Sequence, residues 1–300
     1  MLVAGVANVI VAVAKLVAGL LTGSSAMLAE TAHSVADTLD QGFLLASLRR
    51  SERPADATHP FGYGKERYFW SLLAAFGIFV AGGGFSVFEG ILELRRGGGS
   101  DFPIAYIVLG VSFVSEGTSF IRAYRQVRGE ARHQHRPLAE QVQASPDTTV
   151  KTALFEDSAA VAGLVLAAAG LALQQITGSP VWDGAASMAI GVLLVAVAAR
   201  LGMDSRDLLI GRAADPKLQQ AIRDEIVQTP GIATLLELLT MQLGPDHVIV
   251  AARAALRDDV SADQAEDLAD DIDRRLSETL PVTPHVFIDP TQAPVQARGQ

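Results

Sequence analysis

Six blocks of mostly apolar residues occupy positions 1–209, and each is long enough to cross a lipid bilayer as an α-helix. A hydrocarbon core about 30 Å thick requires about 20 helical residues. The hydrophobic fraction of 49% and the mean hydropathy of +0.29 are high for a soluble protein. We therefore predict an all-α bundle of six transmembrane helices in residues 1–209, with spans at about 3–22, 25–48, 68–95, 102–125, 153–175 and 181–203.

Basic residues near the span ends predict the orientation, because cytoplasmic loops carry an excess of Lys and Arg. The opposite loops, around 22–25 and 174–181, have none, and only Arg95 and Arg96 go against the rule. Both termini are therefore expected in the cytoplasm, with the protein in the inner cell membrane. The basic residues are Arg49, Arg50, Arg53, Lys65 and Arg67 after the second span, and Arg122, Arg125, Arg128, Arg132, Arg136 and Lys151 after the fourth.

The first block has one alternative interpretation, a cleaved secretory signal. It lacks a charged n-region, contains Lys15, and is longer than the 7 to 15 apolar residues of a signal h-region. A transmembrane span is the better interpretation. The absence of cysteine excludes disulfides and thiolate metal ligands.

The remaining residues predict a separate acidic domain at 210–291, followed by a disordered tail at 292–300. Positions 1–209 carry 16 Lys and Arg against 18 Asp and Glu, whereas positions 210–300 carry 8 against 15. Asp215-Pro216 and Ser261 are typical helix starts, and the regions 235–243, 248–256 and 286–288 are typical of strands, the last ending at Asp289-Pro290. This α-β-β-α-β order predicts a cytoplasmic α+β domain with a ferredoxin-like fold.

His33 and Asp37 lie four residues apart inside the second block. Residues at this spacing share a helix face. An ionisable group costs roughly 2.5–3.5 kcal/mol in hydrocarbon, so it usually serves an ion or proton path. An imidazole and a carboxylate on one face would supply half of a metal site. The alternative is a hydrogen bond between neighbouring helices.

Four runs of residues point to one family. In chain order they are Ser25–Asp37 (SAMLAETAHSVAD), His59–Lys65 (HPFGYGK), Leu154–Ala160 (LFEDSAA) and Asp183–Ser187 (DGAAS). Together with the six spans and the acidic tail, they resemble the cation diffusion facilitator family of divalent-metal transporters. The resemblance covers essentially the whole chain.

The resemblance implies a tetrahedral transport site to which the second and fifth spans each contribute two ligands. Carried over, these are His33 and Asp37 from the second span and Asp157 from the fifth. The fourth position, four residues before Asp157, is Ala153 here, so Glu156 is the candidate replacement. Adjacent helix residues point about 100° apart, so Glu156 joins Asp157 only if the rim of the helix faces the ion.

The expected cargo is a divalent transition metal, with no prosthetic group. Zinc, manganese, cobalt and iron(II) all accept imidazole and carboxylate ligands. One His with two or three carboxylates makes a harder site than two imidazoles, which keeps manganese, cobalt and iron(II) as rivals to zinc. Because ligands must be deprotonated to bind metal, protons compete with the ion and would couple efflux to proton entry. His33 would be the natural carrier, since an unperturbed His has a pKa of about 6.5.

Further acidic residues lie inside the predicted spans and could line an ion path together with His33 and Asp37. Glu30 and Asp40 continue the His33–Asp37 face at helical spacing, and Glu116 lies deep in the fourth span. We expect them to serve a proton or ion path, with Asp183 as a further candidate. Hydration near a helix end is the alternative for Glu30 and Asp40, and a bond to a neighbouring hydroxyl is the alternative for Glu116.

The loop after the second span holds Asp56 and His59, which match a second metal site in some family members. The usual third ligand corresponds to Tyr63, so a structural role is the favoured interpretation. Lys65 resembles a family residue that pairs with an acidic residue beyond the sixth span, here Asp207 or Asp204, in a charge interlock near the dimer interface. An exposed lysine at the headgroups is the alternative.

The tail has few residues that suit the regulatory metal sites of some family members. Only the histidines His247 and His285 occur there, with Asp289 at the one acidic position that matches, so no binuclear zinc site is expected. The acidic run Glu266–Asp273 is interpreted as a solvated helix face rather than a calcium site. The His133-Gln134-His135 stretch is interpreted as a hydrated loop.

We therefore expect a homodimeric divalent-metal exporter, a secondary active transporter rather than an enzyme, working by proton antiport and alternating access. Its partners would be the metal ion, protons, the lipid bilayer and a second copy of the chain, without nucleic acid. The alternatives are a metal-binding membrane scaffold or sensor without transport, and a membrane-embedded metalloenzyme. The latter would need a metal-bound water, a general base and a substrate opening, for which no further motif is evident.

Overall fold

The computed structural model describes residues 2–96, 102–133, 136–144 and 148–292. It divides the chain into two compact units, and each is described by itself. The first consists of Met1–Arg50 and Glu66–Arg206, and the second of Ser51–Lys65 and Asp207–Gln300. The tail predicted to be disordered, 292–300, lies outside the described residues except for Gln292.

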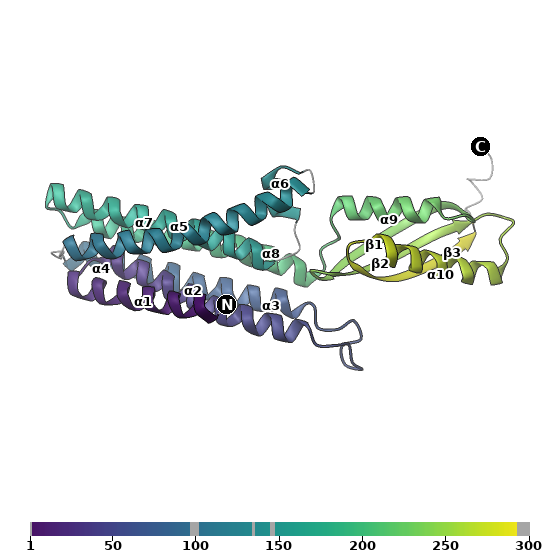
Figure 1. Cartoon of the computed structure of the whole chain (residues 1–300), viewed down its shortest axis with the longest axis horizontal. Helices are drawn as coiled ribbons and strands as arrows, with labels where there is room; N and C mark the ends of the chain where they lie inside the picture. Colours follow the sequence, from purple (N-terminus) through teal and green to yellow (C-terminus); the bar gives the residue numbers. More distant parts are fainter. Residues whose placement is uncertain (1, 97–101, 134–135, 145–147, 293–300) are drawn as a thin grey trace. The chain divides into compact units, whose positions relative to one another are not determined.

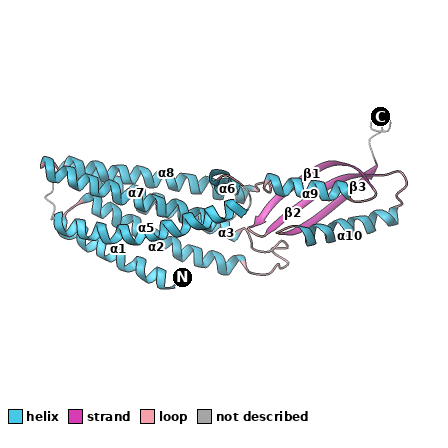
Figure 2. Ribbon diagram, turned by 45° about the horizontal axis from the view of Figure 1, so that its top comes forward, coloured by secondary structure: helices cyan, strands magenta, loops and turns pink. Residues whose placement is uncertain are grey.

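The first unit is a bundle of long helices that run side by side (Figures 1 and 2). Its core is aliphatic and rich in alanine, and α5 packs along both α7 and α1. Gly23 and Gly178 adopt the left-handed conformation, at φ 67° and 71°, in the turns after α1 and α7. The helices are α1 (Leu2–Thr22), α2 (Ser25–Ser51), α3 (Glu66–Gly77), α4 (Phe85–Arg96), α5 (Phe102–His133), α6 (Leu138–Ala144), α7 (Thr148–Thr177) and α8 (Val181–Ile210).

Four helical stretches among the described residues are long and apolar enough to cross a membrane. They are Glu66–Arg95, Phe102–His133, Lys151–Thr177 and Val181–Ile210. The other two predicted spans are helical but differ from these four. The described apolar stretch of α1, Val9–Thr22, is shorter, and α2 is 27 residues long but more polar, because it carries the candidate site residues.

The third predicted span is one helical run with a change of winding in its middle. Between α3 and α4 lies a π-helical segment, η1 (Ile78–Gly84), which ends in Gly82, Gly83 and Gly84. Glycines tolerate the wider π turn, and π segments are frequent at functional sites. Hydropathy did not predict this segment, because a change in winding leaves the apolar pattern of a span intact.

Two pairs of glycines bring α8 close to α4 and η1. A Cβ built on Gly184 would lie 3.0 Å from the carbonyl oxygen of Gly90, and one built on Gly191 would lie 2.9 Å from that of Gly83. Small residues at such positions let helix backbones approach closely in membranes. This seam joins the third and sixth predicted spans.

The second unit contains a small α+β domain in the predicted α-β-β-α-β order. Asp215 caps α9 (Pro216–Gln228) by accepting from the Lys217 amide over 3.0 Å. Ser261 and Gln264 form a capping box at the start of α10 (Ala262–Thr279). The strands β1 (Ile232–Gly244), β2 (His247–Leu256) and β3 (Thr283–Gln292) form one sheet in the order β1-β2-β3, with β1 and β2 antiparallel and β2 and β3 parallel.

The third strand is longer than the predicted 286–288. It continues through Asp289-Pro290 to Gln292, pairing Pro290 with Ala254. β3 is an edge strand of the sheet, which is where proline is tolerated within a β-sheet. The ferredoxin-like assignment itself stays a prediction.

The two faces of the sheet differ in what covers them. Inward residues of β2, including Val248 and Val250, form a core with Ile222 of α9 and Ile272 of α10, so both helices lie on one face. On the other face Leu239 and Phe287 remain 59% and 53% exposed. Both pair in register with Ala251, so they form one apolar row across the three strands.

Candidate functional site

His33 and Asp37 lie on one face of α2, as their spacing predicts. His33 Nε2 is 3.6 Å from Asp37 Oδ2, and the two side chains are 2% and 14% exposed. Both ring nitrogens of His33 and Oδ1 of Asp37 are buried without a hydrogen-bond partner among the described residues. Buried polar atoms are nearly always hydrogen-bonded in proteins, so unpartnered ones call for an explanation. The alternative of a hydrogen bond from His33 to a neighbouring helix finds no support here.

The two predicted ligands of α7 differ in their surroundings. Glu156 shares a hydrogen bond with the carboxyl group of Asp40, while its Oε1 is buried without a partner in the described structure. As whole residues, Glu156 and Asp157 are both partly buried. Asp37 interacts electrostatically with both α7 carboxylates, so the acidic groups of α2 and α7 lie within one field.

These side chains do not form a complete coordination shell. Within the described ranges, no three His, Asp or Glu side chains are grouped so that they could hold a metal ion. The His33–Asp37 pair is the part that is assembled, and the four-ligand set stays a prediction. Ala153, four residues before Asp157, offers no donor atom.

The structure adds a residue that sequence reasoning did not assign to the site, Lys15. It is fully buried in α1, with Nζ 3.2 Å from Glu30 Oε2 of α2 and 3.6 Å from Glu116 Oε1 of α5. The same nitrogen donates to Ser34 Oγ over 2.8 Å. Glu30 and Glu116, expected on an ion path, are therefore neutralised in part by a lysine. The sequence does hold one signal for this role, because Lys15 is a charged residue in the middle of the first apolar block.

Asp183 has a structural partner set that accounts for both of its oxygens. Its Oδ1 accepts from Ser24 Oγ over 2.8 Å, and its Oδ2 accepts from the amides of Ser25 and Ala26 over 2.6 and 3.3 Å. Ser25 Oγ donates to the same oxygen over 3.1 Å. A carboxylate in this position stabilises the start of α2.

Asp56 and His59 lie in the loop of the second unit, where Asp56 holds a turn. Its Oδ1 accepts from the amides of Thr58 and His59 over 2.9 and 2.7 Å, and its Oδ2 accepts from the Tyr63 hydroxyl over 2.7 Å. The Tyr63 hydroxyl, followed by the His59 amide, lowers the pKa of Asp56. These contacts favour the structural interpretation over a second metal site.

Lys65 donates to the carbonyl oxygen of Leu209 over 3.4 Å in the second unit. Asp204, the alternative partner considered for it, lies 3.8 Å from Lys151 and 3.5 Å from Arg200 within the helical unit. The Lys65–Asp207 interlock stays a prediction.

The three residues of the α+β domain considered for a regulatory metal site each contact another side chain. Asp289 pairs with Arg253 over 2.7 Å, and the rings of His247 and His285 stack 6.2 Å apart. Of the stretch His133–His135, His133 is the last residue of α5, and residues 134–135 lie outside the described residues.

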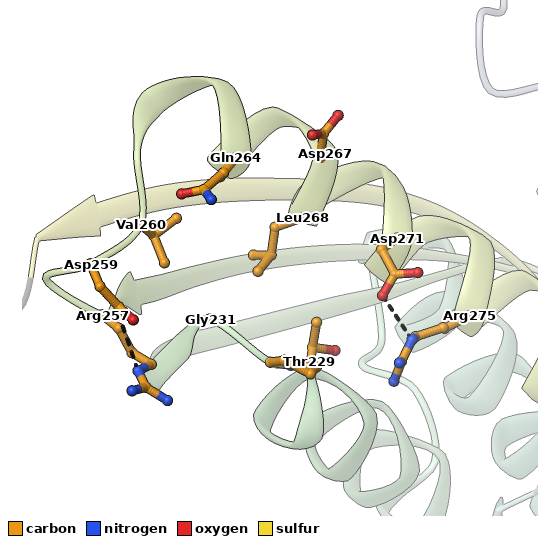
Figure 3. Close-up of a pocket in the computed structure, with 11 residues that line it drawn as sticks. Thr229, Gly231, Arg257, Asp259, Val260, Gln264, Asp267, Leu268, Asp271 and Arg275 are labelled. Carbon is orange, nitrogen blue, oxygen red and sulfur yellow. Dashed lines mark ion pairs between the residues drawn. The ribbon is translucent and has the colours of Figure 1, made fainter.

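The α+β domain also has an open cavity of about 500 Å³ between α10 and the loops before β1 and after β2 (Figure 3). Arg257 pairs with Asp259 over 3.3 Å, and Arg275 pairs with Asp271 over 2.8 Å. The arginines that line it are thus already neutralised by neighbouring carboxylates. Asp271, part of the acidic run, also pairs with Arg274.

Comparison with known proteins agrees with the resemblance noted above. The family model for the cation efflux transmembrane domain matches residues 1–210, and that for the cation efflux protein cytoplasmic domain matches residues 214–290. The first match covers more than half of the chain. The apolar helices and this transmembrane-domain match make the chain an integral membrane protein.

Individual relatives are similar over most of this chain. The proton-coupled zinc antiporter SLC30A9, mitochondrial, of Xenopus laevis is 35% identical over 78% of this chain and 42% of its own length. Metal tolerance protein C4 of Arabidopsis thaliana is 35% identical over 75% of this chain and 49% of its own length. The chain thus spans about two fifths to half the length of these two relatives.

A third relative matches over nearly the full length of both chains, at lower identity. The magnetosome protein MamB of Paramagnetospirillum magneticum is 24% identical over 97% of this chain and 93% of its own length. The family models and these relatives together show that the chain belongs to the cation diffusion facilitator family.

Proposed function

We propose that the chain exports a divalent transition-metal cation across a membrane in exchange for protons. The observation that carries this proposal is the His33–Asp37 pair, whose buried ring nitrogens and carboxylate oxygen have no hydrogen-bond partner among the described residues. Lone pairs of this kind are what a transition metal takes from a protein. The α7 carboxylates Glu156 and Asp157 complete the proposed ligand set.

Zinc is the first candidate cargo, with manganese, cobalt and iron(II) as rivals. The relatives named zinc antiporters support zinc. A set of one imidazole and up to three carboxylates is also acceptable to the harder ions. The ligand set and its charge therefore define a class of cargo rather than one ion.

Proton exchange follows from competition at the ligands. His33 and the carboxylates must be deprotonated to bind metal, so protons that arrive from the opposite side favour release. Glu30, Asp40 and Glu116 are the proposed relay, since each lies in or beside the same electrostatic cluster. Alternating access would expose the cluster to one side at a time.

The proposed assembly is a homodimer of six-span subunits. We place it in the inner cell membrane, with both termini of each subunit in the cytoplasm. Loops rich in Lys and Arg support this orientation. The apolar row formed by Leu239, Ala251 and Phe287 supports a subunit contact through the open sheet face. The match to the cytoplasmic domain of cation efflux proteins, residues 214–290, includes β1, β2 and most of β3.

Flux measurements on vesicles test the proposal. The purified chain is reconstituted, and uptake of zinc, manganese, cobalt and iron(II) is recorded together with internal pH. We expect metal flux with opposed proton movement in the native chain and loss of both signals in Asp37→Ala. The matched control is Asp267→Ala, which removes an exposed carboxylate of α10 and should leave both signals unchanged.

Other outcomes would decide against the proposal. Equal flux in the native chain and Asp37→Ala would remove Asp37 from the site. Metal binding to the native chain without any flux would favour a metal-binding scaffold. Flux of metal without opposed proton movement would exclude antiport.

A further inference from the structure

Lys15 lies where three helices bring charged groups together inside the bundle. Its ammonium contacts Glu30 and Ser34 of α2 and Glu116 of α5, at 3.2, 2.8 and 3.6 Å. Lys15 and Glu30 are fully buried, and the Glu116 side chain is 13% exposed. The triad formed by Lys15, Glu30 and Glu116 is therefore shielded from water. Electrostatic interactions are stronger in such an interior than in water.

The triad is continuous with the proposed metal site. Ser34 follows His33 directly in α2, and Asp37 interacts electrostatically with both Lys15 and Glu116. Glu116 also interacts with Asp157 of α7. The triad that contains Lys15 therefore interacts electrostatically with proposed ligands on both α2 and α7.

The charges of the triad do not cancel. Two carboxylates face one ammonium, and Glu30 Oε1 is buried without a hydrogen-bond partner in the described structure. That oxygen is held against α7, because a Cβ built on Gly163 would lie 2.3 Å from it. The Lys15 ammonium therefore already occupies part of the space between Glu30 and Glu116 that a cation could take.

Stability alone is a poor explanation for such a lysine. Burying an ion pair costs about as much in lost hydration as its attraction returns, and an apolar replacement is often no less stable. Ionisable groups inside membranes are costly and mark functional paths. A carrier also has to release its ion, which a cluster of carboxylates without a counter-charge would oppose.

We propose that Lys15 is a tethered cation that neutralises part of the Glu30–Glu116 charge and thereby weakens divalent-ion binding at the neighbouring His33–Asp37 site. Lys15 is a positioning residue in this scheme, since it acts through the carboxylates and does not touch the ion. The inference rests on the proposed function and deepens it. It predicts that metal affinity is limited by a charge built into α1.

Metal titration of the purified full chain tests the inference. The binding of Zn²⁺ and Mn²⁺ is measured by calorimetry at one pH for the native chain, Lys15→Met, Glu116→Gln and the double variant. A unit charge within about 10 Å changes divalent-ion binding at least roughly tenfold at an effective dielectric constant of about 20. We expect Lys15→Met to bind at least roughly tenfold tighter, Glu116→Gln to bind weaker, and the double variant to bind like the native chain.

Opposite signs separate this role from a purely structural salt bridge. A structural bridge would lower the thermal midpoint in both single variants without moving metal affinity in opposite directions. Lys15→Arg, which keeps the charge, should retain native affinity. Should Lys15→Met fail to fold, the comparison of Glu116→Gln with the double variant still measures the effect of the lysine charge.

The results also separate the inference from the function on which it rests. Equal affinity in the native chain and Lys15→Met would overturn the role of Lys15 alone, provided that His33→Ala still abolishes binding. No binding to the native chain, or binding unaffected by His33→Ala, would overturn both the site and the inference.

Discussion

The backbone amide of Ser25 donates to Asp183 Oδ2 over 2.6 Å, so the first turn of α2 is held by the first turn of α8. The same carboxylate also accepts from Ser24 and Ala26. It therefore caps the helix that carries His33 and Asp37, although 146 or more residues separate Asp183 from them in sequence. The position of the proposed site depends on this contact.

Asp183→Ala should destabilise the chain without removing a metal ligand. Hydrogen bonds to a charged group contribute about 1.5–3 kcal/mol each at most, and the buried donors would lose their acceptor. We expect a loss of roughly 2–3 kcal/mol in the free energy of unfolding, seen as a lower thermal midpoint in detergent. Asp267→Ala, at an exposed position, should leave the midpoint unchanged. An unchanged midpoint for Asp183→Ala would contradict the capping role.

Gly163→Ala should disturb the Lys15–Glu30 contact. The added Cβ would lie 2.3 Å from Glu30 Oε1, so the carboxylate or α7 has to move. Overpacking of this kind costs about 1–3 kcal/mol, and we expect a lower thermal midpoint together with slower metal flux.

A matched control for Gly163→Ala is available in α5. A Cβ built on Gly110 meets nothing within 4 Å, so Gly110→Ala should behave like the native chain. The same thermal midpoint and flux in both alanine variants would show that Glu30 does not need the space beside Gly163.

Much of this architecture follows from local sequence signals. The spacing of His33 and Asp37 predicts their shared face, and the starts of α9 and α10 follow from the caps Asp215 and Ser261. Contacts between distant helices carry no such signal. Lys15 meets Glu116 across about a hundred residues, so only the fold reveals that a lone charge in α1 belongs to the cluster.

The α7 part of the proposed site could not be predicted from the sequence for a similar reason. Helical periodicity fixes the direction of Asp157 relative to Glu156, but the rotation of α7 against α2 depends on the packing of the whole bundle. The extension of β3 past Pro290 likewise depends on its place at the sheet edge, which a strand pattern does not encode.

Acidification should loosen the Asp56 turn. The pKa of Asp56 is lowered in the folded chain by the Tyr63 hydroxyl and the His59 amide. Its contribution to the turn is therefore present above the unfolded pKa of about 3.9 and is lost as pH falls through the lower folded value. Amide NMR signals of Thr58 and His59 should shift below about pH 4, and Asp56→Ala should show the loosened state at neutral pH.

The same NMR experiment tests the second metal site. Under the structural interpretation, Zn²⁺ added at neutral pH leaves the His59 ring signals unchanged. A zinc-dependent shift of those signals that disappears in Asp56→Ala would support a metal site in the loop instead.

Charge placed on the open sheet face should separate the proposed dimer. Leu239 is 59% exposed and lies in the apolar row with Phe287, so Leu239→Asp would put a carboxylate into the proposed subunit contact. We expect a shift from dimer to monomer by light scattering of the full chain in detergent. Val227 of α9 is 50% exposed outside this row, and Val227→Asp is the matched control. A dimer that persists in Leu239→Asp would place the subunit contact on another surface, because a buried, unpaired charge opposes association.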